Sequence, residues 1–153
     1  MKSQRIYIDT SVLGGYFDAE FEEPTKELFE KVRHGDYKIV ISDLTESELL
    51  KAPEKVKTLL NDLNIEYEIV SLTDDSIALA DEYVKENVVG QTSRNDCLHI
   101  AIATLARLDL LVSWNFRHIV NIKRIRGYNG INIKNGYPSL EIRSPKEVID
   151  YED

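Results

Sequence analysis

Three acidic residues stand where the sequence changes from one predicted element to the next. Asp9 directly follows a short β-rich run, and Asp96 opens a strongly apolar helical segment. Glu48 lies on a short helical segment that follows a second β-rich run. In parallel α/β sheets the carboxyl ends of the strands form the ligand crevice. We therefore expect these carboxylates near one sheet edge, where they would raise each other's pKa values unless cations neutralised them.

This set of side chains predicts a divalent metal site. Oxygen-only ligands suit Mg²⁺ or Mn²⁺, and the predicted metal ligands are Asp9, Asp96 and Glu48. Ions of this kind activate bound water and stabilise charge on a phosphate, so a phosphodiester is the natural substrate. Asn115, which follows the predicted strand 110–113, completes the predicted catalytic set.

Each acid also has a structural interpretation that the sequence leaves open. Asp9 could cap a helix starting at Thr10, because Asp is a favourable N-cap residue. Asp96 could be a first-turn acid stabilised by the helix dipole. Glu48 could form an ordinary surface pair with Lys51, three residues later. No single residue is specific, and the prediction rests on the set.

Several polar residues near the acids are candidates for positioning the substrate. The hydroxyls of Thr10 and Ser11 could orient the first acid or a bound phosphate, or they could cap a helix. Ser113 could act in the same way beside the predicted fourth site residue. Arg94, just before the third acid, is a candidate for phosphate contact.

Other chemically distinctive residues are interpreted as structural. His99 lies one turn after the third acid and could face the site, but we favour a core histidine with satisfied hydrogen bonds. Trp114 is expected in the core. Cys97 is the only cysteine, which excludes an internal disulfide and a thiolate zinc cluster, and we expect it to be a small buried hydrophobe.

The charge of the chain is strongly negative. A formal net charge of −8 argues against a broad basic surface for nucleic acid, although a carboxylate cluster counts as negative only until its metal binds. The dense basic stretch contains Lys123, Arg124 and Arg126, with Tyr128 close behind. We interpret it as a solvated loop; the alternative is phosphate contact with base stacking on Tyr128.

Length and composition predict one globular domain over residues 1–153. The chain is 42% hydrophobic and 30% charged, which is typical of a folded domain rather than a disordered segment. No apolar run approaches the roughly 20 residues that a membrane helix needs. Because no secretory signal is visible either, we expect a cytoplasmic protein that makes no membrane contact.

Strand-like and helix-like segments alternate, which favours a parallel α/β sheet. Asp43 is expected to cap a helix at 44–51, with Glu46 as its acidic capping-box partner. Asn95 or Ser93 is expected to cap the apolar helix 96–107. The chain beyond Trp114 is rich in Gly and Asn and gives weaker signals. The predicted strands are 6–8, 37–41, 67–70 and 110–113, and the other predicted helices are 24–35, 53–64, 74–87 and 146–150.

Four motifs in this order resemble those of the PIN-domain family, and within it the VapC-like toxins of toxin–antitoxin pairs. The second motif, as the family has it, assigns the site position to Glu48 rather than Glu46. The tail 142–148 also resembles the ending of one branch of the family. The motifs are Ile8-Asp9-Thr10-Ser11-Val12, Ile41-Ser42-Asp43-Leu44-Thr45-Glu46-Ser47-Glu48-Leu49, Asn95-Asp96-Cys97-Leu98-His99-Ile100-Ala101 and Leu111-Val112-Ser113-Trp114-Asn115-Phe116-Arg117-His118-Ile119.

The resemblance implies a three-layer α/β/α fold with a central parallel sheet and cleavage of single-stranded RNA with Mg²⁺ or Mn²⁺. It also implies a homodimer and an antitoxin protein that fills the site. The family's fourth motif usually supplies Asp, whereas this chain has Asn115, which removes one negative charge. We therefore expect one tight metal site at Asp9 and Asp96, and a second that fills only with substrate.

Two other enzyme classes fail on their motifs, and one non-enzyme class stays open. A haloacid dehalogenase-type phosphatase needs a second Asp two residues after the first, where this chain has Ser11. A P-loop needs a Gly-rich run ending in Lys-Ser or Lys-Thr, which is absent from the sequence. A degenerate PIN domain that binds RNA or protein without cutting is the alternative function, and Asn115 is the feature that favours it.

Overall fold

The computed structural model describes residues 3–90 and 93–150, and within them five parallel strands form one sheet. The strand order is β3-β2-β1-β4-β5, so the first strand lies at the centre of the sheet. Ile6 of β1 is paired with Ile39 of β2 on one side and with Leu110 of β4 on the other. The strands are β1 (Gln4–Ile8), β2 (Tyr37–Ser42), β3 (Tyr67–Val70), β4 (Leu110–Val112) and β5 (Ile142–Arg143).

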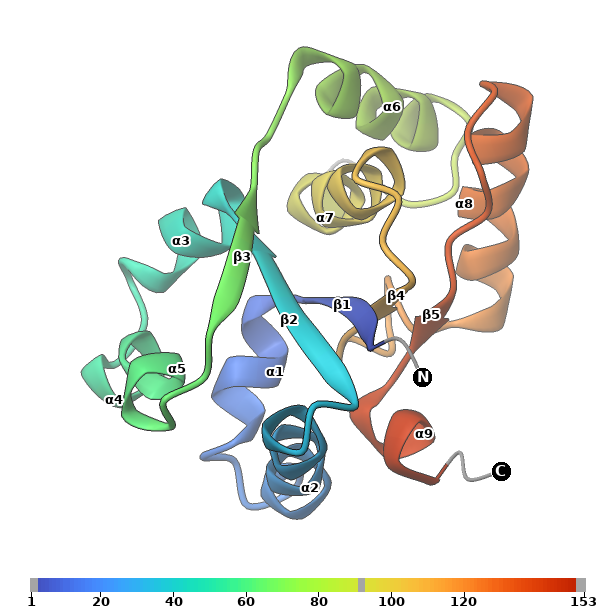
Figure 1. The fold of residues 1–153 in the computed structure, drawn as a ribbon. Helices are drawn as coiled ribbons and strands as arrows, with labels where there is room; N and C mark the ends of the chain where they lie inside the picture. The colour runs from blue at the N-terminus through green and yellow to red at the C-terminus, as the bar shows by residue number, and fades with distance from the viewer. Residues whose placement is uncertain (1–2, 91–92, 151–153) are drawn as a thin grey trace.

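Helices cover both faces of this sheet, which confirms the predicted three-layer α/β/α fold. Figure 1 shows α6, α7 and α8 on one side of the strands and α1, α2 and α9 on the other. Alternate residues of β1 feed the two cores, because Tyr7 packs with the first group while Ile6 and Ile8 pack with the second. The helices are α1 (Thr10–Gly15), α2 (Glu22–Arg33), α3 (Asp43–Leu49), α4 (Glu54–Lys57), α5 (Leu59–Asp62), α6 (Asp74–Lys85), α7 (Arg94–Leu105), α8 (Ile122–Lys134) and α9 (Pro145–Asp150).

The apolar helix α7 is the centre of the first core, as its composition predicts. Its residues 97–104 are all buried, and among them Cys97 is a buried hydrophobe as expected. The helix begins at Arg94, two residues before the predicted start. Ser93 occupies the N-cap position, but its hydroxyl makes no capping bond. No helix in the described ranges is long and apolar enough to cross a membrane.

The predicted cap of the next site-bearing helix, α3, is wrong by one residue. Ser42, rather than Asp43, is the N-cap residue, and its Oγ accepts a hydrogen bond from the backbone N–H of Thr45. The hydroxyl of Thr45 accepts from the Ser42 N–H in return, so Glu46 has no part in the capping box. Asp43 instead accepts a bond from the Leu72 N–H at 2.8 Å, which ties α3 to the segment after β3.

The structure also corrects the interpretation of three segments. The predicted helix 53–64 is divided at Thr58 into α4 and α5. The basic stretch lies on α8 rather than in a loop, and β5 has no counterpart among the predicted strands. Tyr128 is fully buried and donates to the carbonyl of His118, so it cannot stack on a nucleobase.

Candidate active site

Asp9 is the buried centre of the site, at the point where β1 passes into α1. It occupies the N-cap position of α1 but makes no side-chain capping bond, so capping alone does not account for it. Its Oδ1 accepts from the Ser11 hydroxyl at 2.5 Å, and its Oδ2 accepts from the Ser113 hydroxyl at 2.6 Å. Only 5% of the residue is exposed.

The two serines connect Asp9 to the end of β4. The backbone N–H of Trp114 donates to Ser11 Oγ at 2.9 Å, and that of Asn115 donates to Ser113 Oγ at the same distance. Each serine oxygen therefore accepts a hydrogen bond from the backbone that follows β4 and donates its own hydroxyl hydrogen to the carboxylate of Asp9. The sequence predicted that Ser11 and Ser113 position other groups, and in the structure both hold Asp9.

Asp96, on the first turn of α7, shares the electrostatic environment of Asp9. Burial raises the pKa of Asp96, and the negative charge of Asp9 raises it further. Burial likewise raises the pKa of Asp9, against the lowering effects of His99 and the two serine hydroxyls. Two carboxyl groups that are both harder to ionise than usual are therefore coupled at the carboxyl end of the central strand.

Asn115 contributes to this pair through its amide nitrogen. Its Oδ1 accepts backbone N–H bonds from Arg117 at 3.1 Å and from His118 at 2.9 Å. A side-chain hydrogen bond from Asn115 also lowers the pKa of Asp96. The amide oxygen takes part in the turn, so the nitrogen is the group of Asn115 that can donate to Asp96.

Glu48 is held at the side of this pair by two hydrogen-bond donors on one oxygen. Thr10 Oγ1 donates to Glu48 Oε1 at 2.5 Å, and His99 Nε2 lies 2.9 Å from the same oxygen. Burial acts to raise the pKa of Glu48, but the hydrogen bond and charge of His99, together with Thr10, lower it overall. In the described ranges Glu48 makes no ion pair with Lys51, so the surface-pair interpretation is wrong.

Tyr7 is a residue beside the site that the sequence analysis missed, and it contacts His99, which the sequence placed either in the core or facing the site. His99 is 2% exposed, and its Nδ1 lies 2.5 Å from the hydroxyl of Tyr7. Tyr7 Oη lies 2.7 Å from the hydroxyl of Ser42, at the N-cap of the helix that carries Glu48. Burial raises the pKa of Tyr7 above its usual range, so the phenol keeps its proton. His99 is thus a satisfied core histidine, as predicted, and it also faces the site.

The carboxylate fixes the direction of the bond between Glu48 and His99. An ionised Glu48 can only accept, so His99 Nε2–H donates to it. His99 Nδ1 and the Tyr7 hydroxyl share the next hydrogen bond, and the Tyr7 and Ser42 hydroxyls share the one after it. These hydrogen bonds connect Ser42, the N-cap of α3, through Tyr7 of β1 and His99 of α7 to Glu48 of α3. We call this chain of hydrogen bonds the circuit.

The remaining predicted residue, Arg94, is engaged elsewhere. Its guanidinium lies 3.2 Å from Asp81 of α6, in an exposed ion pair. Exposed pairs of this kind contribute little to stability, and this one does not fix Arg94 near the carboxylates.

The residues present suit a hard divalent cation held by two of the three acids. Within the described ranges no three His, Cys, Asp or Glu side chains gather closely enough to hold a metal ion. One oxygen of the third acid, Glu48 Oε1, is bonded to His99 and Thr10. Asp9 and Asp96 provide oxygen donors whose charges repel each other, and a cation would relieve that repulsion.

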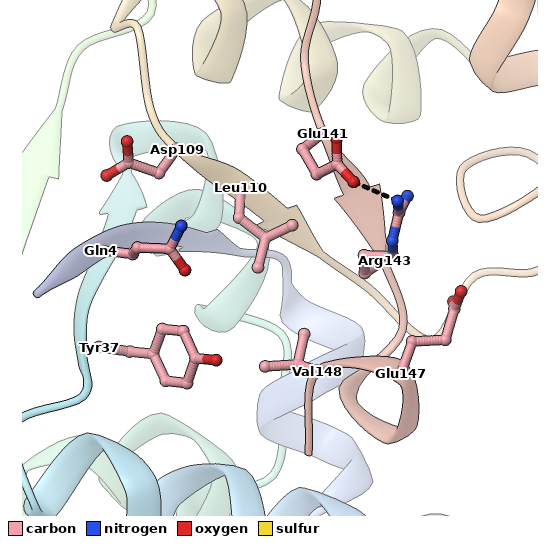
Figure 2. A pocket seen from close by; sticks show the side chains of 8 residues that line it. All are labelled: Gln4, Tyr37, Asp109, Leu110, Glu141, Arg143, Glu147 and Val148. Atoms are coloured by element: carbon pink, nitrogen blue, oxygen red, sulfur yellow. Dashed lines mark ion pairs between the residues drawn. The ribbon is translucent and has the colours of Figure 1, made fainter. Parts of the chain in front are cut away.

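A separate pocket of about 430 Å³ extends from the starts of the central strands to Arg143 and Glu147 (Figure 2). It is lined by residues at the starts of strands, among them Gln4, Tyr37 and Leu110. Its acids already have partners: Asp109 accepts from the Arg5 N–H at 2.8 Å, and Glu141 is paired with Arg143. The carboxylates of the candidate site are not part of this pocket.

Comparison with solved structures identifies similar folds at low sequence identity. VapBC2 from Rickettsia felis, bound to a DNA fragment from its promoter, matches with a TM-score of 0.55 and 17% identity over 92% of this chain and 98% of that chain. FitAcB from Neisseria gonorrhoeae matches with a TM-score of 0.58 and 15% identity over 92% and 97%. A toxin–antitoxin complex from Klebsiella pneumoniae matches with a TM-score of 0.53 and 18% identity over 73% and 88%.

Comparison of the sequence with protein families identifies the family. Curated proteins gave no match. The PIN domain family, however, matches residues 6–120, a span that contains Asp9, Glu48, Asp96 and Asn115. This span is well over half of the chain, and the solved structures share its fold. The chain therefore belongs to the PIN-domain family.

Proposed function

We propose that this protein is a Mg²⁺- or Mn²⁺-dependent endoribonuclease that cleaves single-stranded RNA. PIN domains are generally nucleases that use divalent metal ions. The observation that carries the proposal is the coupling of Asp9 and Asp96 at the carboxyl end of the central strand. A buried carboxylate and a half-buried one, both with raised pKa values, are unfavourable in a structural role, and they suit a cation-dependent reaction.

In this proposal Asp9 and Asp96 hold the ion, and other residues fix their orientation. When bound, the metal supplies a lower pKa for a bound water and stabilisation of charge on the phosphate. Ser11 and Ser113 fix both oxygens of Asp9. Asn115 fixes Asp96 and leaves the centre with one negative charge fewer than a fourth acid would give. We therefore retain the prediction of one tight ion, with a second that fills only with substrate.

Glu48 has one oxygen available for chemistry. Its Oε1 takes bonds from Thr10 and His99, whereas the described contact of Oε2 is a long one of 3.4 Å from Asn95. Because its pKa is lowered, Glu48 stays ionised at neutral pH. It can therefore accept a hydrogen bond from a water and orient it toward the scissile phosphate.

We further propose that the nuclease is the toxin of a toxin–antitoxin pair. The three similar structures are VapBC2, FitAcB and a toxin–antitoxin complex, and this chain belongs to the PIN-domain family. An antitoxin could inhibit the enzyme by placing an Arg side chain among the carboxylates, since bidentate Arg–carboxylate pairs are strong. A homodimer and a cytoplasmic location stay predictions.

A non-catalytic PIN domain that binds RNA or protein is the second candidate. The amide of Asn115, in place of a fourth acid, is the observation that favours it. The three remaining acids favour the enzyme, because a binding module gains nothing from like charges held together.

The test is cleavage of a labelled single-stranded RNA by wild type and by Asp96→Asn, in Mn²⁺, in Mg²⁺ and in EDTA. Asp75→Asn, an exposed acid on α6, is the matched control for purification and charge. We expect metal-dependent cleavage by wild type and Asp75→Asn, and none by Asp96→Asn. Equal cleavage by all three would indicate a contaminating nuclease. No cleavage by any of them on several RNAs would favour the binding module.

A further inference from the structure

The segment that leaves the candidate site carries a charge opposite to that of the whole chain. Residues 110–140 contain five of the 19 Lys and Arg residues and none of the 27 Asp and Glu residues. This segment includes β4, the turn at Asn115 and all of α8. In a protein of net charge −8, this part of the sequence is net positive, and it starts beside the carboxylates of the candidate site.

An apolar groove of about 490 Å³ lies along this segment. It is at the same sheet edge as the site, because the N–H of Ser113 donates to the carbonyl of Arg143 at the end of β5. The one acid that lines the groove, Glu147, accepts a bond from the Ser144 N–H. Its lining includes Phe116, Val120, Ile122, Ile125, Arg126 and Arg143.

Phe116 presents an aromatic ring at the start of the groove. It directly follows Asn115 in the chain and is 49% exposed. Trp114 contacts the ring edge-on, with centroids 6.0 Å apart, and Trp114 is itself stacked on Phe21 at 4.3 Å. The ring is therefore supported from the core while about half of the residue faces solvent. This is a suitable platform for a planar ligand.

Three exposed cations accompany the ring. Arg117, Lys123 and Arg126 are exposed, and in the described part of the chain their side chains make no ion pair or hydrogen bond. The other two cations of the segment are occupied, Arg124 by the carbonyl of Val88 and Lys134 by Glu86. The free positive charge is thus concentrated between residues 117 and 126, close to the site.

We propose that Phe116, Arg117, Lys123 and Arg126, which we call the basic strip, bind the RNA strand beside the scissile phosphodiester. A base stacks on Phe116, and neighbouring phosphates contact the three cations. This inference rests on the proposed ribonuclease function and adds the path of its substrate. A single strand of RNA offers both a planar base and regularly spaced negative charge, which match both features of the strip. An acidic peptide matches only the charge.

The test measures binding separately from cleavage. In the Asp96→Asn background, a fluorescent single-stranded oligoribonucleotide is titrated by anisotropy at several salt concentrations. Phe116→Ala is expected to weaken binding about 5- to 150-fold, the usual range for the loss of one stacked base. Phe116→Tyr keeps the ring and should restore the affinity. Lys123→Gln combined with Arg126→Gln should reduce the slope of log affinity against log salt by about 1.4, or about 0.7 per phosphate contact.

Two controls separate a local effect from a loss of folding or of total charge. Ile133→Ala removes an exposed apolar side chain elsewhere on α8, and Lys85→Gln removes an exposed cation on α6. Both should bind like the parent. All variants are compared by circular dichroism and thermal unfolding before titration.

The outcomes distinguish this inference from the proposed function. Strip-dependent RNA binding without any cleavage by the wild type would support the strip and reject the nuclease. Cleavage by the wild type whose KM is unchanged by Phe116→Ala and by the double variant would support the nuclease and overturn the strip. Unchanged RNA affinity together with weakened binding of an acidic peptide would also overturn it, in favour of a protein-binding surface.

Discussion

Replacing Tyr7 by Phe removes a single oxygen from the circuit that holds Glu48. The Phe ring fills the same buried space on β1, so packing is preserved. The lost hydroxyl lies 2.5 Å from His99 Nδ1 and 2.7 Å from Ser42 Oγ. The substitution therefore tests whether the position of His99, which contacts Glu48, depends on its hydrogen bond to Tyr7.

The expected loss of stability follows from the groups left without partners. A buried polar atom that loses its partner costs about 1–3 kcal/mol, and His99 Nδ1 is such an atom. Ser42 can turn to the hydroxyl of Thr45, 3.3 Å away, so its loss should add little. We expect a decrease of about 2 kcal/mol in the free energy of unfolding, or about 4–8 °C in melting temperature.

Urea unfolding measures that decrease, and Tyr83→Phe is the matched control. Tyr83 is equally buried, and its hydroxyl donates to Asn132 in the core between α6 and α8. Both variants should lose stability. Only Tyr7→Phe should shift the ¹⁵N signals of the His99 ring and lower the rate of metal-dependent cleavage, because only Tyr7 connects to Glu48.

The signals of the His99 ring are the decisive measurement for the circuit, because the loss of any buried hydroxyl would lower the stability. Unchanged ring signals and full cleavage in Tyr7→Phe would refute the circuit, even if the protein melted at a lower temperature. A shift of the His99 signals in Tyr83→Phe would show that the effect is not local.

Three further substitutions test the electrostatics of the site in the absence of metal. Asp9→Asn should stabilise the protein at pH 7 in EDTA. Burial raises the pKa of Asp9, so the stability of the wild type falls as the pH rises from the ordinary value of about 3.8 through the pKa of the folded protein. Urea unfolding should show that the variant is more stable than the wild type above this pH range and that the difference vanishes below it. Glu48→Gln should destabilise at pH 7, because the folded pKa of Glu48 is lowered and its contribution is lost only as the pH falls below the ordinary 4.5; equal unfolding midpoints at pH 7 would contradict this. Asn115→Asp should raise the pKa of Asp96 and bind a second Mn²⁺ without RNA, which calorimetric titration would detect.

Local sequence signals predicted the sheet and its central helix well. The β-rich runs that became β1 to β4 stand out against their polar flanks, and the apolar residues around α7 indicate a helix buried on all sides. The error at the start of α3 has a simple origin. Ser42 and Asp43 are both good N-cap residues, and only the backbone conformation of Ser42, extended at φ −126° and ψ 171°, distinguishes them.

The helix α8 was missed because its composition opposes its structure. Gly127, Asn129 and Gly130 all have poor helix propensity. Tertiary contacts explain the choice at Gly127, where an added Cβ would lie 2.9 Å from a methyl group of Val88. Close packing of α8 on the segment after α6 thus requires a glycine, whereas a glycine in the sequence alone favours a loop.

The acids of the site could be recognised from the sequence, but their supports could not. Asp9 and Asp96 follow from their positions at the end of a strand and the start of a helix. The partnership of Tyr7 with His99 joins residues 92 positions apart, and no local pattern encodes it. The direction of the Asn115 amide was equally hidden, since only the turn to Arg117 and His118 shows that its oxygen is occupied.

The site has two halves that differ in how well the protein compensates their charge. Glu48 receives two strong donors on one oxygen, and its pKa is lowered. Asp9 also accepts two hydrogen bonds, yet the effect of burial is larger and its pKa is raised. The negative charge of Asp9 also raises the pKa of Asp96. A cation therefore gains more by binding between Asp9 and Asp96 than beside Glu48. In the proposed nuclease a metal ion would complete that under-compensated half, whereas Glu48 is already ionised and held in place by its own hydrogen bonds.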